Sequence, residues 1–252
     1  MKLLVSLLAS LMFSLCFAQD DHYLAKIEQA NGAYAEAAYD SALSIYTEVY
    51  QSGYESFSLY YNMANSFYKQ GEIPSAILFY ERAIKLNPSD KDAQFNIAIA
   101  QEASVDKIEK LPVFIGSQFW KNFRSSYTMD SWAWLAILFL LLSSLSFLLF
   151  IRAKDAGTRK VFFYGSIFCV SLFLLSMISA ESAYNYRFKK ESGIIFSPSI
   201  TVQSAPAQNS GELFVLHEGT KVILLGEENT WYNIRLEDGN EGWVPSASIE
   251  PI

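Results

Sequence analysis

The feature that most constrains the fold of this chain is an internal repeat at an offset of 34 residues. The stretch SALSIYTEVY, which begins at Ser41, returns as SAILFYERAI from Ser75. Identical residues at this offset are Ala30 and Ala64, Asn31 and Asn65, Tyr34 and Tyr68, Ser41 and Ser75, Ala42 and Ala76, and Tyr46 and Tyr80. A constant period of this size indicates stacked supersecondary units, because no single unit can bury its apolar face alone. Two unrelated amphipathic hairpins would share helical periodicity but not a constant offset.

The second copy resembles a tetratricopeptide repeat, a pair of helices 34 residues long. The residues that carry this resemblance are Tyr60, Met63, Ala64, Phe67, Ala76, Tyr80 and Pro88. Small Ala64 and Ala76 let two helices approach, and the aromatic residues fill the space around them. The first copy is poorer, since Lys26 and Gln29 replace bulky apolar residues. We expect an all-α tetratricopeptide array of about two and a half repeats, with a last helix over residues 91–109.

Such arrays bind through a concave face that the first helix of each repeat lines. By repeat position, this face is expected to include Asn31, Tyr34, Tyr61, Asn65 and Tyr68. The alternative is that these tyrosines only pack the helix surfaces. Tetratricopeptide domains that clamp a carboxylate use asparagines and several cations. Here Ile27, Asp92 and Asn96 occupy the cation positions, which argues against a carboxylate clamp.

Two uncharged runs, residues 132–151 and 161–180, are each long enough to cross a bilayer. The loop between them, residues 152–160, carries four basic side chains and one acid, which predicts a cytoplasmic position. The first 18 residues read as a secretory signal peptide. Both signals predict that the repeats and the C-terminal part lie outside the cytoplasm. Residues 111–131 are expected to form an interfacial linker, or else a docking helix for a partner.

The C-terminal part alternates apolar and polar residues in short runs between turn signals, which indicates a small all-β barrel. Its expected strands are residues 200–202, 212–216, 222–225, 231–236 and 242–244, with a hairpin turn at Asp238-Gly239. The motif Trp231-Tyr232, Asp238-Gly239 and Gly242-Trp243-Val244-Pro245 resembles a bacterial SH3 domain.

This resemblance implies that Trp231 and Pro245 face a ligand. Alternatively, Trp231 and Trp243 belong to the barrel core. Ser248 stands where SH3 grooves usually have tyrosine, so polyproline binding is not expected.

The expected limits of the parts follow from these patterns. They are a signal peptide at 1–18, the repeats at 19–110, the linker at 111–131, transmembrane helices at 132–151 and 161–180 around a cytoplasmic loop at 152–160, a linker at 181–197, and the SH3-like domain at 198–252.

Composition argues against several classes of function. The net charge is −7 and both candidate soluble parts are acidic, which argues against nucleic acid as a ligand. His22 and His217 are the two histidines, and they lie in different parts of the chain. We find no hydrolase, phosphate-loop or paired-cysteine metal motif. We therefore expect no catalytic residues, no metal and no cofactor.

The whole order of parts resembles the Bacteroides aerotolerance protein BatE family. The features that carry this resemblance are the signal peptide, the short repeat array, the stretch VDKIEKLP from Val105, the apolar hairpin and the C-terminal SH3-like part. The resemblance implies an inner-membrane protein that assembles envelope proteins in stress resistance. It also implies partners, namely von Willebrand A-domain aerotolerance membrane proteins and a MoxR-type ATPase. The alternatives are a cell-wall adaptor that binds peptidoglycan peptides through the SH3 module, and an enzyme with an unrecognised site.

Overall fold

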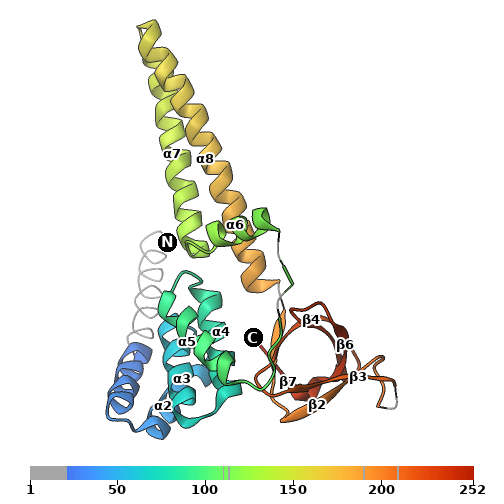
Figure 1. Ribbon diagram of the computed structural model, residues 1–252. Helices are drawn as coiled ribbons and strands as arrows, with labels where there is room; N and C mark the ends of the chain where they lie inside the picture. The colour runs from blue at the N-terminus through green and yellow to red at the C-terminus, as the bar shows by residue number, and fades with distance from the viewer. Residues whose placement is uncertain (1–21, 110, 113, 190, 209) are drawn as a thin grey trace, which may run out of the picture. The chain divides into compact units, whose positions relative to one another are not determined.

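The computed structural model describes residues 22–109, 111–112, 114–189, 191–208 and 210–252 (Figure 1). The predicted signal peptide at 1–18 lies outside these residues. The chain forms a helical repeat array, two long apolar helices and an antiparallel sheet, which confirms the predicted fold class. The array and the sheet belong to one compact unit, and the two apolar helices belong to another.

The array consists of five helices. The first covers residues 22–35, and it is followed by α2 (Tyr39–Gln51), α3 (Phe57–Gln70), α4 (Ile73–Leu86) and α5 (Lys91–Ala103). Two local signals set the second repeat. Ser56 caps α3 by accepting a hydrogen bond from the Leu59 backbone, and Gly71 ends α3 with a left-handed φ of 82°. Pro74 lies in the first turn of α4, where its missing N–H costs nothing.

The repeated small and aromatic residues form the core of the array. Ala30, Ala42, Ala64 and Ala76 have no exposed surface. Tyr46 and Tyr80, which also share the 34-residue offset, are buried as well. Since alanine lets two helix axes approach closely, these positions set the spacing within each helical pair.

The last helix is shorter than predicted. It ends at Ala103, and residues 104–109 form an extended segment rather than two more helical turns. The prediction of helix over 91–109 was therefore wrong at its C-terminal end. The physical reason lies in tertiary contacts, because Asp106 and Ile108 of this segment contact the barrel.

The apolar hairpin pairs α7 (Met129–Arg152) with α8 (Ala156–Phe188). Both helices are long and apolar enough to cross a membrane, as judged by length and composition. Serine hydroxyls bridge the two helices, with Ser146 donating to the Phe162 carbonyl at 2.8 Å. The turn between the two helices covers residues 153–155 and lies within the predicted loop at 152–160. Asp155 caps α8 by accepting from the Thr158 N–H at 2.9 Å.

A separate short helix, α6 (Ile115–Arg124), precedes the hairpin and contacts α8. It falls within the predicted linker at 111–131. Its C-terminal end is held by Trp132 of α7, whose Nε1 donates to the Arg124 carbonyl at 3.0 Å.

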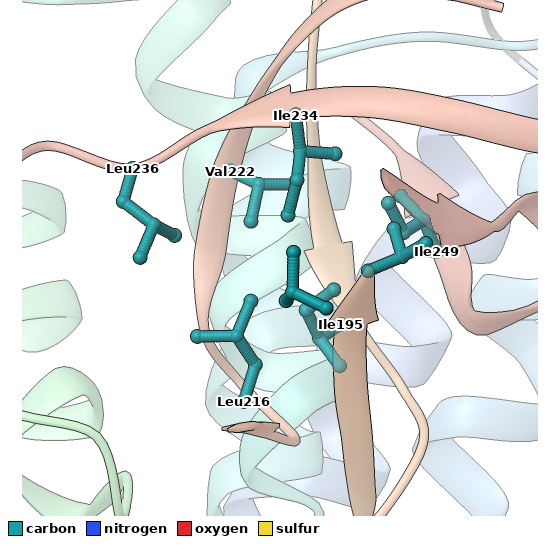
Figure 2. Close-up of a cluster of buried hydrophobic side chains, with 8 residues drawn as sticks. Ile195, Leu216, Val222, Ile234, Leu236 and Ile249 are labelled. Atoms are coloured by element: carbon teal, nitrogen blue, oxygen red, sulfur yellow. The ribbon is translucent and has the colours of Figure 1, made fainter. Parts of the chain in front are cut away.

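The C-terminal sheet has seven antiparallel strands in the order β3-β2-β6-β5-β4-β1-β7. They are β1 (Ser192–Ile195), β2 (Ser199–Gln203), β3 (Glu212–His217), β4 (Lys221–Glu228), β5 (Trp231–Arg235), β6 (Glu241–Pro245) and β7 (Ile249–Pro251), with a 3-10 turn at Ser246–Ser248 before β7. The sheet curls around the buried cluster of Ile195, Val202, Leu216, Val222, Ile234, Leu236, Val244 and Ile249 (Figure 2).

The five predicted strands are present, and Gly239 in the β5–β6 hairpin has the expected positive φ, of 92°. The strands β1 and β7 were missed, so the barrel begins at Ser192 rather than at residue 198. All four residues of β1 are buried, so the strand has no alternation to detect. Gly193 is required there, because a Cβ would lie 2.3 Å from Ile249 Cγ2.

Replacing Ala76 with Leu should destabilise the array. Ala76 has no exposed surface, so the larger side chain must push α3 and α4 apart, at a cost of about 1–3 kcal/mol. Thermal unfolding of the full chain, followed by helical circular dichroism, should show a lower midpoint. Ser75→Leu on the same helix is a control at a half-buried position. Equal midpoints for Ala76→Leu and the parent chain would contradict the close helix contact.

Candidate functional site

A three-residue hydrogen-bonded group occurs twice in the array, once in each repeat. The Tyr46 hydroxyl donates to Oδ1 of Asn31 at 2.5 Å, and Nδ2 of Asn62 donates to the same oxygen at 2.8 Å. One repeat later, Oδ1 of Asn65 accepts from the Tyr80 hydroxyl at 2.5 Å and from Nδ2 of Asn96 at 3.1 Å. All three positions of the group are therefore 34 residues apart in sequence and equivalent in structure.

Burial keeps the two phenols of these groups protonated. It raises the pKa of Tyr46 to about 12 and raises that of Tyr80 above its ordinary value of 10.0. Because a neutral phenol carries a proton, each tyrosine acts as the donor to its asparagine. Each asparagine oxygen is thus held from two sides, which orients the amide.

An open cavity of about 300 Å³ lies at the second of these groups. Its lining residues are Tyr34, Tyr61, Asn65, Tyr68, Lys69, Tyr80, Asn96 and Ile99. They come from the first helix of the chain's described part, from α3, α4 and α5, which places the cavity on the face expected to be concave. Lys69 is the single charged side chain among these lining residues.

The cavity offers hydrogen-bond donors. Since Oδ1 of Asn65 accepts two bonds, its Nδ2 group is left to donate, and among the described residues nothing accepts from it. Nδ2 of Asn96 donates to the Tyr61 hydroxyl at 3.0 Å, which leaves the Tyr61 proton available. Aromatic faces surround these donors. The cavity therefore suits a ligand that combines hydrogen-bond acceptors with apolar groups and carries little charge.

Four of the five residues predicted for the concave face line this cavity, namely Tyr34, Tyr61, Asn65 and Tyr68. Asn31 does not line it and belongs instead to the equivalent group one repeat earlier. Tyr61 also packs on the helix surface, which was the alternative role for these tyrosines, because its ring stacks on Phe57 with centroids 5.6 Å apart.

Sequence reasoning did not place Lys69, Tyr80, Asn96 and Ile99 in this site, and it noted Asn62 only as a match to the asparagines of a carboxylate clamp. The 34-residue offset between Asn62 and Asn96 was the available signal for one pair of them.

On the barrel, Trp231 and Pro245 lie opposite each other on β5 and β6. Both are half-buried, and neither belongs to the core cluster; the same holds for Trp243. Ser248 is buried and donates its hydroxyl hydrogen to the Pro245 carbonyl at 2.5 Å. This buried serine therefore supports the turn at Pro245.

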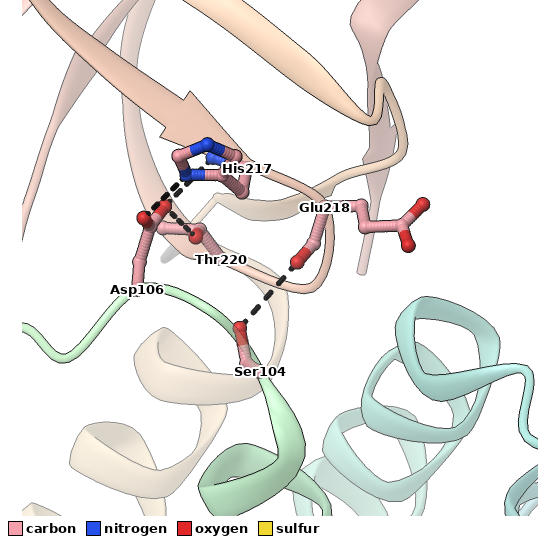
Figure 3. Close-up of polar contacts among 5 residues, drawn as sticks. All are labelled: Ser104, Asp106, His217, Glu218 and Thr220. Carbon is pink, nitrogen blue, oxygen red and sulfur yellow. Dashed lines mark hydrogen bonds and ion pairs between the residues drawn. The ribbon is translucent and has the colours of Figure 1, made fainter.

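Asp106 joins the array to the barrel (Figure 3). Its carboxylate accepts from the His217 backbone N–H at 2.7 Å and from the Thr220 hydroxyl at 2.6 Å, and it contacts His217 Nδ1 at 2.8 Å. Burial alone would raise the pKa of Asp106, but the bonds from Thr220 and His217 outweigh it and hold the pKa below 3.8. An ionised carboxylate only accepts, so Nδ1 of His217 carries the proton in this contact.

Charged residues of α4 make a second set of contacts with the barrel. Glu81, buried in the array, pairs with Lys221 of β4 at 2.6 Å. Arg82 donates to the Pro251 carbonyl at 2.8 Å and to the Tyr50 hydroxyl at 2.9 Å. Charged residues of α4 are therefore bound to the barrel, while Asn65, Tyr80 and Asn96 of the second group line the cavity.

Comparisons with known proteins identify two parts of the chain. Residues 57–90 match the family model for the tetratricopeptide repeat, and residues 199–250 match that for the bacterial SH3 domain. No curated protein matches the chain. The tetratricopeptide match covers α3, α4 and the turn after them, and this range contains Tyr61, Asn65, Tyr68, Lys69 and Tyr80 of the cavity lining. Both modules are typical of protein–protein interaction. Among the described residues, no group of three or more histidine, cysteine or acidic side chains could hold a metal ion.

Replacing Asp106 with Ala should loosen the barrel from the array. The change removes the acceptor for buried Thr220, and a hydrogen bond to a charged group contributes about 1.5–3 kcal/mol. We expect faster amide hydrogen exchange in residues 104–109 and 217–220, with unchanged exchange in α3. Exposed Asp92→Ala on α5 is the matched control. Protection of residues 217–220 that survives Asp106→Ala would contradict this role.

Proposed function

We propose that this protein is a non-enzymatic scaffold anchored in the bacterial inner membrane. Its repeats and its SH3-like barrel are presented to the periplasm, where they bring envelope proteins together. The observation that carries the proposal is the cavity at Asn65, with oriented amide donors among aromatic rings and a single charged side chain in its lining.

The chemistry of the cavity favours an extended, uncharged segment of a partner protein. Backbone carbonyls of such a segment would accept from Asn65 and Tyr61, and an apolar side chain would pack on Tyr68. Main-chain recognition of this kind provides affinity, and pockets for side chains provide specificity. The equivalent amide of Asn31 lies one repeat away and would extend the same contact along the segment.

The resemblance to the BatE family suggests the partners. They are the von Willebrand A-domain aerotolerance membrane proteins, together with a MoxR-type ATPase system, in stress resistance. The two apolar helices and the bacterial SH3 match support the envelope location.

A second function is favoured by the barrel surface. Trp231 and Pro245 form a half-buried pair on adjacent strands, outside the core cluster. A pair of this type would suit the stem peptides of peptidoglycan, in which case the protein is a cell-wall adaptor.

Replacing Tyr68 with Ala should release partners bound to the repeats. Truncation of an aromatic anchor typically costs about 2 kcal/mol or more, or roughly thirtyfold in affinity. Tyr68 is a better choice than Tyr61, because Tyr61 also stacks on Phe57 and accepts from Asn96. The measurement is affinity purification from native membranes with quantitative mass spectrometry.

Two further variants make this test specific. Tyr54→Ala removes a half-buried tyrosine that packs against Tyr23 and does not line the cavity, so it should keep the partners. Trp231→Ala should keep them too. If partners are lost with Trp231→Ala and retained with Tyr68→Ala, recognition belongs to the barrel. Binding of purified peptidoglycan, sensitive to Trp231→Ala, would then support the wall adaptor.

Membrane topology provides a separate test. The basic residues around the hairpin turn predict that this turn lies in the cytoplasm. A reporter active only in the periplasm should work when fused after Gln101 or after Ile252, and it should fail at Gly157. Activity at Gly157 and its absence after Ile252 would reverse the orientation.

A further inference from the structure

The helix α6 has two distinct faces. With 3.6 residues per turn, Ile115, Phe119, Trp120 and Phe123 fall on one side. The opposite side carries Ser117, Gln118, Lys121 and Arg124, and Asn122 lies at the border of the apolar side, next to Ile115. None of the ten residues of α6 is buried. A helix of this kind requires an apolar surface to cover one side and water to cover the other.

Only one end of the apolar stripe is covered. Phe123 packs against Trp132 of α7, with ring centroids 5.1 Å apart. Farther along the same stripe, Phe119 is 70% exposed and Ile115 is 85% exposed. Phe114, just before the helix, is 81% exposed. The uncovered stripe thus continues directly from the apolar base of the hairpin.

The contacts of α6 with α7 and α8 fix its position along the hairpin. Arg124 donates to the Ser182 carbonyl of α8 at 3.3 Å and lies over the Tyr186 ring at 4.5 Å. Ser182 follows the uncharged run of α8, which ends at Ala180, and Trp132 begins the uncharged run of α7. Both attachment points therefore mark the open end of the hairpin, away from the turn at residues 153–155, and α6 crosses this end (Figure 1).

We propose that α6 lies in the surface of the lipid bilayer, with Ile115 and Phe119 inserted between lipid chains and Lys121 among the headgroups. The inference rests on the proposed function in one respect, the crossing of the membrane by α7 and α8. The apolar stripe of α6 is continuous with the exposed apolar side of α7, which lipid covers if α7 crosses the membrane. The same lipid would also cover the stripe of α6, which argues for lipid as the occupant. Amphipathic helices in this position insert by about 5–10 Å.

The experiment places an environment-sensitive fluorophore at single cysteines of the full chain. Cys16→Ser and Cys169→Ser are introduced first, since these are the two native cysteines. Phe119→Cys tests the apolar side, and Ser117→Cys, on the opposite side of the same helix, is the matched control. Leu141→Cys, 63% exposed on α7, reports on the crossing of the membrane. The purified protein is reconstituted at low density in vesicles of phosphatidylethanolamine and phosphatidylglycerol.

The expected result is blue-shifted emission at position 119, with quenching by lipids labelled near the headgroup, and no quenching at 117. Equal aqueous exposure at 117 and 119, with position 141 quenched by lipids labelled deep in their chains, would overturn this inference alone. Loss of quenching at 141 as well would overturn the membrane crossing. Protection of position 119 from water only at high protein density would assign the stripe to a second copy of the chain. Protection only in native membranes would assign it to another protein. Either result would overturn the proposal.

Discussion

Close approach of helices at four alanines is the constraint on which the recognition surface depends. Ala30, Ala42, Ala64 and Ala76 have no exposed surface, and each pair of them sets the distance within one repeat. At that distance the Tyr46 and Tyr80 hydroxyls reach the oxygens of Asn31 and Asn65. An asparagine held in this way presents its amide nitrogen in a defined direction. Tight apolar packing and oriented polar donors are therefore two results of the same repeat.

The array and the barrel form one compact unit rather than two modules on a loose tether. Asp106 accounts for much of the contact between the array and the barrel. Its carboxylate accepts hydrogen bonds from a backbone N–H, a hydroxyl and a histidine ring at the β3–β4 turn. Ile108 adds an apolar contact to the barrel core. The segment that holds these residues follows directly from α5, which contributes Asn96 and Ile99 to the cavity. The cavity and the surface of Trp231 and Pro245 thus belong to the same compact unit.

The apolar hairpin follows a different packing rule. Its helices meet at small residues such as Ala136, Ser143 and Ser179, so their larger apolar side chains point outward. Serine hydroxyls bond to carbonyls within the hairpin, which satisfies these polar groups internally. The helix α8 has 33 residues, or about 50 Å, and thus exceeds the roughly 30 Å thickness of a bilayer core. Its last turns carry Ser182 and Tyr186, which contact Arg124 of α6.

The local pattern of residues by itself determined the fold class. Periodicity, turn residues and apolar length predicted the repeats, the hairpin and five strands, because these depend on near neighbours in the chain. Position on the first helix of each repeat also predicted four of the cavity-lining residues. Tertiary structure decided the rest. The strand β1 forms where a fully buried segment finds partners on β4 and β7, and α5 stops at Ala103 because Asp106 and Ile108 gain contacts on the barrel. Such contacts join residues that are distant in the sequence, 111 positions apart for Asp106 and His217. Their free energy can override local helix preference without leaving a periodic signal in the sequence.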